Sequence, residues 1–147
     1  MHKTISLSQY VKRRNGVPLG GTGSMRNMLE RSLGAGSFNL FWYYWNPIWS
    51  YYLSRNVMRP LSRLLPFWLA TITTFAISGG LHDLAVTLVK WRITFFFTPW
   101  FLIMGLLVVL SKGLNIVYRA YSWPVRVLCN LAFIALSLWI NQNLLAL

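Results

Sequence analysis

A stretch of eighteen uncharged residues, 64–81, limits what this chain can fold into more than any other feature. As a helix rising about 1.5 Å per residue it would reach roughly 27 Å, close to the thickness of the hydrocarbon core of a bilayer. Two further apolar stretches follow, at residues 93–110 and from residue 125 to residue 138 or beyond. We therefore expect an all-α, polytopic membrane protein with about three transmembrane helices.

The composition supports a membrane protein. Of the 147 residues 56% are hydrophobic, and only Glu30 and Asp83 are acidic, against fourteen lysines and arginines. A soluble domain would be short of surface carboxylates. The net charge of +12 could indicate a nucleic-acid binder. However, the basic residues lie between or beside the apolar stretches, where lipid headgroups are the expected partners. We expect the lipid bilayer as a partner and no nucleic acid.

The basic residues are unevenly distributed along the chain. Residues 1–63 hold nine lysines and arginines, residues 112–126 hold three, and residues 90–92 hold two. Loops rich in lysine and arginine stay on the cytoplasmic side of a membrane. The distribution predicts an integral membrane protein with a cytoplasmic N-terminus, and we expect it in a bacterial inner membrane.

The chain divides into three regions. Residues 1–37 form a basic, glycine-rich arm with a short amphipathic helix, which we expect Ser24 to cap and Gly34 to end. Residues 38–63 form aromatic and arginine-rich interfacial helices, and residues 64–147 form the transmembrane region. The single cysteine, Cys129, excludes an intrachain disulfide, and no cluster of metal ligands is visible, so we expect no metal site.

Tryptophans and tyrosines are concentrated in the segment FWYYWNPIWSYYLSRNVMRPL, which begins at residue 41. Such rings gather at the bilayer interface, so we expect this segment at headgroup depth. A helix should stop near Asn46, because the residue before a proline avoids the α conformation, and a second helix should start at Pro47 with Asn46 as its cap. In that second helix Arg55 and Arg59 share one stripe, and Pro60 should end or kink it. The two arginines are either headgroup anchors or a phosphate site, and the two roles are compatible.

A histidine, His82, follows the first apolar stretch. Gly79 and Gly80 predict a loosened helix end, so we expect His82 at membrane depth where two helical pieces join. An ionisable group there is costly unless it lines a cavity or meets a partner. The alternative is a structural histidine that satisfies a buried polar group. Asp83, the next residue, should diverge from His82 on a helix and is not expected to be its partner.

In combination these segments resemble the signature half of the membrane-bound O-acyltransferase family. Members of that family have a tryptophan-rich segment with an Asn, Asp or His after the last Trp, and then a histidine in a pattern similar to S-G-x-x-H. The matching residues here are Trp42, Trp45, Asn46, Ser78, Gly79 and His82. The resemblance covers about residues 38–92, whereas typical members have several hundred residues and many more spans. Leu81 occupies the position of the usual bulky residue before the histidine, and Asp83 occupies that of the small residue often found after it.

The resemblance implies a catalytic role for His82 as the base, assisted by Asn46. Transfer of an acyl group from a thioester to a hydroxyl requires removal of a proton from the acceptor, which an imidazole can perform near neutral pH. No Ser-His-Asp or Cys-His set is visible, which favours direct transfer over an acyl-enzyme. The expected donor is acyl coenzyme A or another acyl thioester, with no tightly bound cofactor. The residues expected to bind the donor are Arg55, Arg59, Trp42, Trp45 and Trp49.

The competing class is a non-catalytic membrane subunit that scaffolds a larger membrane complex. In that case the chain has lost the reaction tunnel, and His82 has a structural role. Three spans bury little internal surface. With either function we therefore expect a homo-oligomer or a larger membrane-protein partner, which could supply missing walls of the site.

Overall fold

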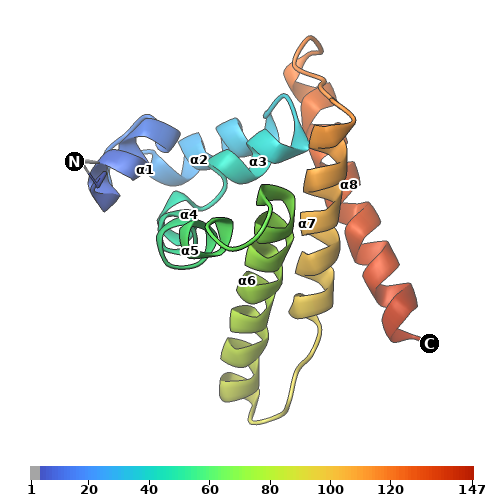
Figure 1. Ribbon diagram of the computed structural model, residues 1–147. Helices are drawn as coiled ribbons and strands as arrows, with labels where there is room; N and C mark the ends of the chain where they lie inside the picture. The colour runs from blue at the N-terminus through green and yellow to red at the C-terminus, as the bar shows by residue number, and fades with distance from the viewer. Residues whose placement is uncertain (1–3) are drawn as a thin grey trace.

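A computed structural model describes residues 4–147 of the chain, and over that range the protein is helical with no strand (Figure 1). The elements are α1 (Leu7–Asn15), α2 (Ser24–Leu33), α3 (Phe38–Tyr44), α4 (Pro47–Leu53), the π-helical segment η1 (Ser54–Met58), α5 (Arg59–Ser62), α6 (Phe67–Lys90), α7 (Phe97–Gly113) and α8 (Trp123–Leu145). The all-α prediction is confirmed.

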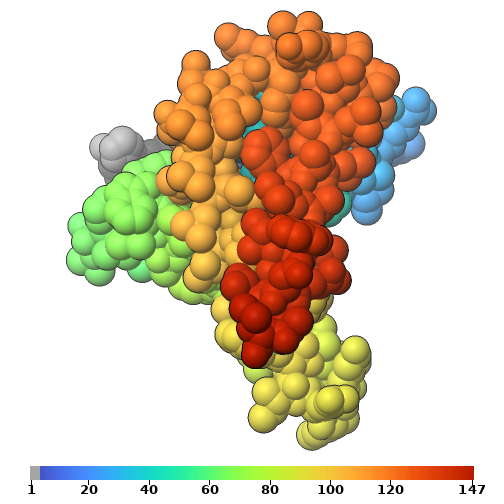
Figure 2. All heavy atoms as spheres, turned by 90° about the vertical axis from the view of Figure 1, so that its right-hand side faces the viewer, coloured from blue at the N-terminus to red at the C-terminus, as the bar shows by residue number. Residues whose placement is uncertain are grey.

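The long helices stand side by side, and the short helices lie across one end of them. α6 and α7 form an antiparallel hairpin, and α8 packs against α7. α1, α2 and α3 lie roughly at right angles to this hairpin, at the end where the α7–α8 connection also lies (Figure 1). The α6–α7 connection lies at the opposite end and projects beyond the rest of the molecule (Figure 2).

Two helices are long and apolar enough to cross a membrane: α6 with 24 residues and α8 with 23. Only 17% of the most apolar stretch of α6, and 11% of that of α8, is buried against the rest of the chain. The core helix of a soluble protein would be mostly buried. α7 is also apolar but is shorter, with 17 residues, and it is not among the helices of membrane-spanning length. The prediction of three membrane-length helices is therefore corrected to two.

α7 begins at Phe97, four residues later than the apolar pattern predicts, and it extends to Gly113, three residues beyond the predicted end. The carboxylate of Asp83 on α6 accepts hydrogen bonds from the backbone N–H groups of Phe96, Phe97 and Thr98 at 2.9, 2.8 and 2.7 Å. It also accepts one from the Thr98 hydroxyl at 2.6 Å. Because the first N–H groups of a helix lack partners within it, this buried carboxylate fixes where α7 starts.

The N-terminal arm contains the short helix that the sequence predicts, with a different residue at its start. Gly34 ends α2 as expected, but the N-cap is Gly23 in a left-handed conformation, φ 77°, which glycine adopts readily. Ser24 is instead the first helical residue, and its hydroxyl accepts a hydrogen bond from Nδ2 of Asn15 at 2.8 Å. Ser24 therefore joins α2 to α1 rather than capping α2.

The two helices predicted around Asn46 are confirmed. α3 ends at Tyr44, and α4 begins at Pro47 with the side chain of Asn46 as its cap. Beyond α4 the helical run does not end before Pro60, where the sequence predicts an end or a kink. It changes to the π-helical segment η1, and Pro60 lies in the first turn of α5.

The core is formed where α3 meets α7 and α8. Phe38 is fully buried and stacks on Phe133 of α8 with ring centroids 4.7 Å apart. Asn130 of α8, also fully buried, donates from Nδ2 to the carbonyl oxygens of Leu33 and Ala35 at 2.8 and 3.0 Å. α8 therefore holds the α2–α3 turn in place by both packing and hydrogen bonds.

Candidate functional site

His82 lies within the continuous helix α6, and not at a join between two helical pieces as the sequence predicts. The reason is the environment of Gly79. A Cβ on this glycine would overlap the backbone of Phe97 and Thr98, whereas a Cβ on Gly80 would make an ordinary contact with the Thr98 hydroxyl. Gly79 thus lets α7 approach α6 closely, and neither glycine ends α6; small residues commonly have this role between helices.

The imidazole of His82 is held by its own helix. Its Nδ1 atom lies 2.7 Å from the carbonyl oxygen of Ser78. A carbonyl oxygen can only accept, so Nδ1 must carry the hydrogen and donate it. In the neutral ring Nε2 is then the unprotonated nitrogen, and among the described residues it has no hydrogen-bond partner.

Three aromatic rings from two other helices surround the imidazole. The ring of Trp49 from α4 meets it edge to face, with centroids 5.9 Å apart, and the rings of Phe97 and Phe101 from α7 lie at 5.7 and 4.9 Å. The indole Nε1 of Trp49 donates to the hydroxyl of buried Ser78 at 3.0 Å. α4, α6 and α7 therefore meet at His82.

Asn46 does not contact His82 directly. Its Oδ1 atom accepts from the backbone N–H of Trp49 at 3.2 Å, and its own backbone N–H donates to the sulfur of Met28 at 3.3 Å. The structure links the two predicted catalytic residues through Trp49, whose backbone is held by Asn46 and whose ring packs on His82. The side chain of Asp83 forms no hydrogen bond with that of His82 either, as expected, and caps α7 instead.

The other predicted tryptophans, Trp42 and Trp45, are partly buried and pack against the core. Trp45 stacks on Phe41 with ring centroids 5.5 Å apart, and Trp42 meets the ring of Phe75 edge to face at 5.2 Å. The indole Nε1 of Trp42 is buried without a hydrogen-bond partner among the described residues. Of the three tryptophans predicted to bind the donor, only Trp49 reaches His82.

Arg55 and Arg59 lie together on the exposed side of η1 and α5. They line a hollow of about 10 Å³, roughly the room needed for one water molecule. Arg55 donates to the hydroxyl of Tyr51 at 2.9 Å, and that hydroxyl donates to the carbonyl of Ile5 at 3.4 Å. No hydrogen bond joins either arginine to His82 within residues 4–147.

Arg14, which was not among the residues predicted from the sequence, joins α1 to α3 and to α4, the helix that carries Trp49. Its guanidinium lies between the rings of Tyr10 and Tyr43, 4.1 and 4.0 Å from their centroids. It donates to the carbonyl of Tyr43 at 2.9 Å and to the hydroxyl of Ser50 at 3.3 Å. Burial lowers the pKa of Arg14 from its usual value. The spacing of four between Tyr10 and Arg14 is the signal that could have indicated this contact.

No family model, curated protein or solved structure matches this chain. The resemblance to the membrane-bound O-acyltransferase family stays a prediction carried by residues 38–92.

Proposed function

We propose that this chain is a membrane-embedded protein of the O-acyltransferase type, in which His82 removes a proton from a hydroxyl acceptor. The observation that carries the proposal is the orientation of the imidazole. Nδ1 donates to the carbonyl of Ser78, so the unprotonated Nε2 is the nitrogen available to a substrate.

Membrane embedding is supported by the surface of the long helices. Few residues in the most apolar stretches of α6 and α8 are fully buried by the rest of the chain. At the projecting end of the α6–α7 hairpin the apolar side chains of Trp91 and Ile93 are almost fully exposed beside Lys90 and Arg92. Exposed apolar side chains beside basic ones are typical of a membrane–water interface. We further propose a cytoplasmic N-terminus in a bacterial inner membrane, since α1 and the basic α7–α8 connection share one end of the molecule.

The proposed reaction is a direct transfer. Nε2 of His82 takes the proton of the acceptor hydroxyl as that oxygen attacks the carbonyl carbon of the acyl thioester. The bond between that carbon and the sulfur then breaks, and the leaving thiolate takes the proton back from Nε2. The hydrogen bond from Nδ1 to Ser78 keeps the ring in place and stabilises the transient imidazolium.

The surrounding residues have supporting roles in this proposal. Trp49, Phe97 and Phe101 shield the imidazole from water on the sides that they cover. Asn46 acts as a positioning residue through Trp49, and not by holding the imidazole itself. The exposed guanidiniums of Arg55 and Arg59 are the proposed partners for the phosphates of acyl coenzyme A.

A non-catalytic membrane subunit is the second candidate, and one observation favours it. The hydrogen bond from Nδ1 to Ser78 stays within α6, as expected of a histidine that only satisfies a polar group of its own helix. With so little of α6 and α8 covered, a second copy of the chain or a larger membrane protein would complete either kind of complex.

Replacing His82 by alanine distinguishes the two candidates. If His82 is the base, His82→Ala removes acyl transfer by the purified complex while assembly and the amount of protein in the membrane stay near wild type. If His82 is structural, the variant assembles poorly, because burying unmet polar groups costs about 1 to 3 kcal/mol. Acyl transfer at the wild-type rate by the variant in a complete complex would overturn the enzymatic proposal.

A further inference from the structure

A hollow of about 310 Å³ opens where the start of α8 meets α2, α3 and the turn between them. We propose that this hollow binds the phosphate-bearing headgroup of a membrane lipid, with Arg126 as the partner of the phosphate. The volume is at the lower end of the range for small-molecule sites. The inference depends on the proposed membrane location but not on the chemistry of His82.

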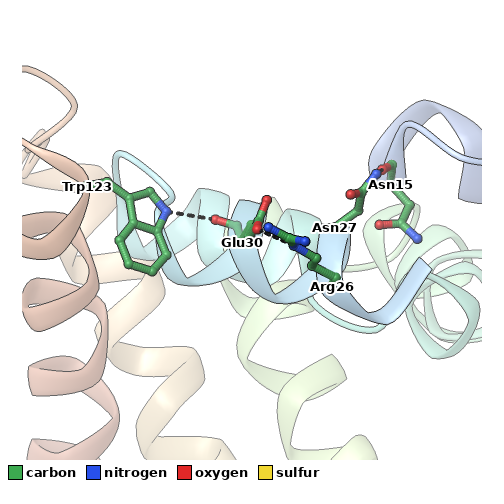
Figure 3. Close-up of polar contacts among 5 residues, drawn as sticks. All are labelled: Asn15, Arg26, Asn27, Glu30 and Trp123. Atoms are coloured by element: carbon green, nitrogen blue, oxygen red, sulfur yellow. Dashed lines mark hydrogen bonds and ion pairs between the residues drawn. The ribbon is translucent and has the colours of Figure 1, made fainter. Parts of the chain in front are cut away.

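The hollow is built by two glycines and an indole. A Cβ on Gly34 would overlap the ring of Trp123, and a Cβ on Gly36 would overlap the backbone and side chain of Arg119. The indole Nε1 of Trp123 donates to the carbonyl of Glu30 at 3.1 Å, so the ring is fixed against α2 as one wall (Figure 3). A side chain at Gly34 would displace Trp123 at the start of α8, and one at Gly36 would displace Arg119 in the α7–α8 connection.

Arg126, in the first turn of α8, supplies the positive charge. Its Nε atom is buried and has no hydrogen-bond partner among residues 4–147. Arg126 lines the hollow, and a guanidinium can donate two parallel hydrogen bonds to one phosphate. The acidic residue at the edge of the hollow, Glu30, is bound by Arg26 at 2.8 Å, and no salt bridge joins it to Arg126 within the described part of the chain (Figure 3).

The position of the hollow favours a lipid over a soluble phosphate. It lies at the first turn of α8, and a group at the end of a membrane-length helix lies at headgroup depth. Leu40 and Trp123 line the hollow and are 38% and 44% exposed, so part of its rim is apolar. The uncovered surface of α8 continues from this end (Figure 2). A lipid could therefore place its phosphate on Arg126 and its chains along the apolar surface.

The test uses the full chain purified in detergent, with dioleoyl phosphatidylglycerol as the probe and native mass spectrometry to count bound lipid. Arg126→Gln should weaken binding about tenfold, because a charged hydrogen bond to phosphate is lost. The matched control, Arg92→Gln, removes an exposed arginine at the opposite end of the long helices and should bind as wild type. Dioleoylglycerol, which has the same chains without phosphate, should bind wild type and Arg126→Gln equally.

A second variant and a competitor complete the test. Leu40→Trp fills the hollow without changing charge, and it should also weaken phosphatidylglycerol binding. If Arg126→Gln fails to fold, the Leu40→Trp variant alone decides the test. Glycerol 3-phosphate carries a phosphate group like that of the lipid but no acyl chains, and it should not displace the lipid at equal concentration. Unchanged lipid binding in the folded variants would overturn the site, and full displacement by glycerol 3-phosphate would overturn its assignment to a lipid.

Discussion

The indole of Trp49 packs edge to face against the imidazole of His82, with ring centroids 5.9 Å apart and planes at 87°. The same indole donates a hydrogen bond to the hydroxyl of Ser78, whose carbonyl oxygen holds Nδ1 of His82. Trp49 therefore acts on the histidine in two ways, by ring packing and through Ser78. The position of the imidazole depends on α4 as well as on its own helix.

Trp49→Phe tests this dependence. The variant keeps a ring but loses the hydrogen bond to Ser78, so we expect a loss of about 1 kcal/mol in unfolding free energy and slower acyl transfer. Trp68→Phe is the matched control, because Trp68 is 53% exposed at the start of α6 and no hydrogen bond from its indole is present in the described structure. Unfolding in detergent and initial transfer rates measure both effects. Equal stability and equal transfer rates in the two variants would show that the hydrogen bond between Trp49 and Ser78 affects neither property.

Asn46 should act by positioning. Asn46→Ala removes the cap of α4 and places alanine at φ 40°, so we expect a loss of about 1 to 2 kcal/mol in stability and slower transfer. Asn46→Asp keeps an oxygen that can accept from the Trp49 N–H and should restore most of both properties. Thermal unfolding measures the stability, and separate values of kcat and KM show whether turnover or substrate binding has changed. An aspartate variant that is stable but loses transfer as severely as a His82 variant would indicate direct contact with the substrate instead.

Gly79 and Gly80 provide a matched pair of substitutions. Gly79→Ala places a methyl group against the backbone of Phe97, and we expect it to destabilise the α6–α7 hairpin by about 1 to 3 kcal/mol. Gly80→Ala meets only an ordinary contact with Thr98, and it should be neutral or stabilise α6 by up to about 1 kcal/mol. Thermal unfolding of the two proteins in the same detergent measures the difference. Equal melting temperatures would contradict the close approach of the two helices at Gly79.

Asp83 should be required for the start of α7. Asp83→Ala leaves the N–H groups of Phe96, Phe97 and Thr98 without their acceptor, at a cost of about 1 to 3 kcal/mol. Hydrogen exchange at those amides should become faster. Glu30→Gln is the control, since it changes the other, exposed acid of the chain and should alter stability by less than about 0.5 kcal/mol. Unchanged protection at residues 96–98 in Asp83→Ala would rule out this capping role.

Local signals predicted the parts of the fold that depend on neighbouring residues. The break between Asn46 and Pro47 follows from the restriction that a proline places on the residue before it, and it is confirmed. The end of α2 at Gly34 is also confirmed, although Gly34 has φ −85° and not the left-handed conformation of a typical glycine cap. The apolar stretches likewise indicated the long helices, although with boundaries several residues away from those of α6 and α7.

The remaining differences arise from contacts between distant residues. Gly79 suggested a helix end, because its role in admitting α7 is visible only when the two helices are placed together. The carboxylate of Asp83 sets the start of α7 from another helix, and no local pattern around Phe97 reveals it. The contact between Trp49 and His82 likewise joins α4 to α6. The resemblance that singled out Asn46 and His82 gave no indication that Trp49 lies between them.

The most direct test of the account is the rate of acyl transfer by His82→Gln in the purified, fully assembled complex. The glutamine amide can still donate to the carbonyl of Ser78, so we expect the fold to be preserved. An amide is too weak a base, however, to remove the proton from a hydroxyl. We expect normal assembly and a transfer rate lower by about 10² to 10⁴. A His82→Gln complex that transfers the acyl group at the wild-type rate would contradict the proposed role of His82.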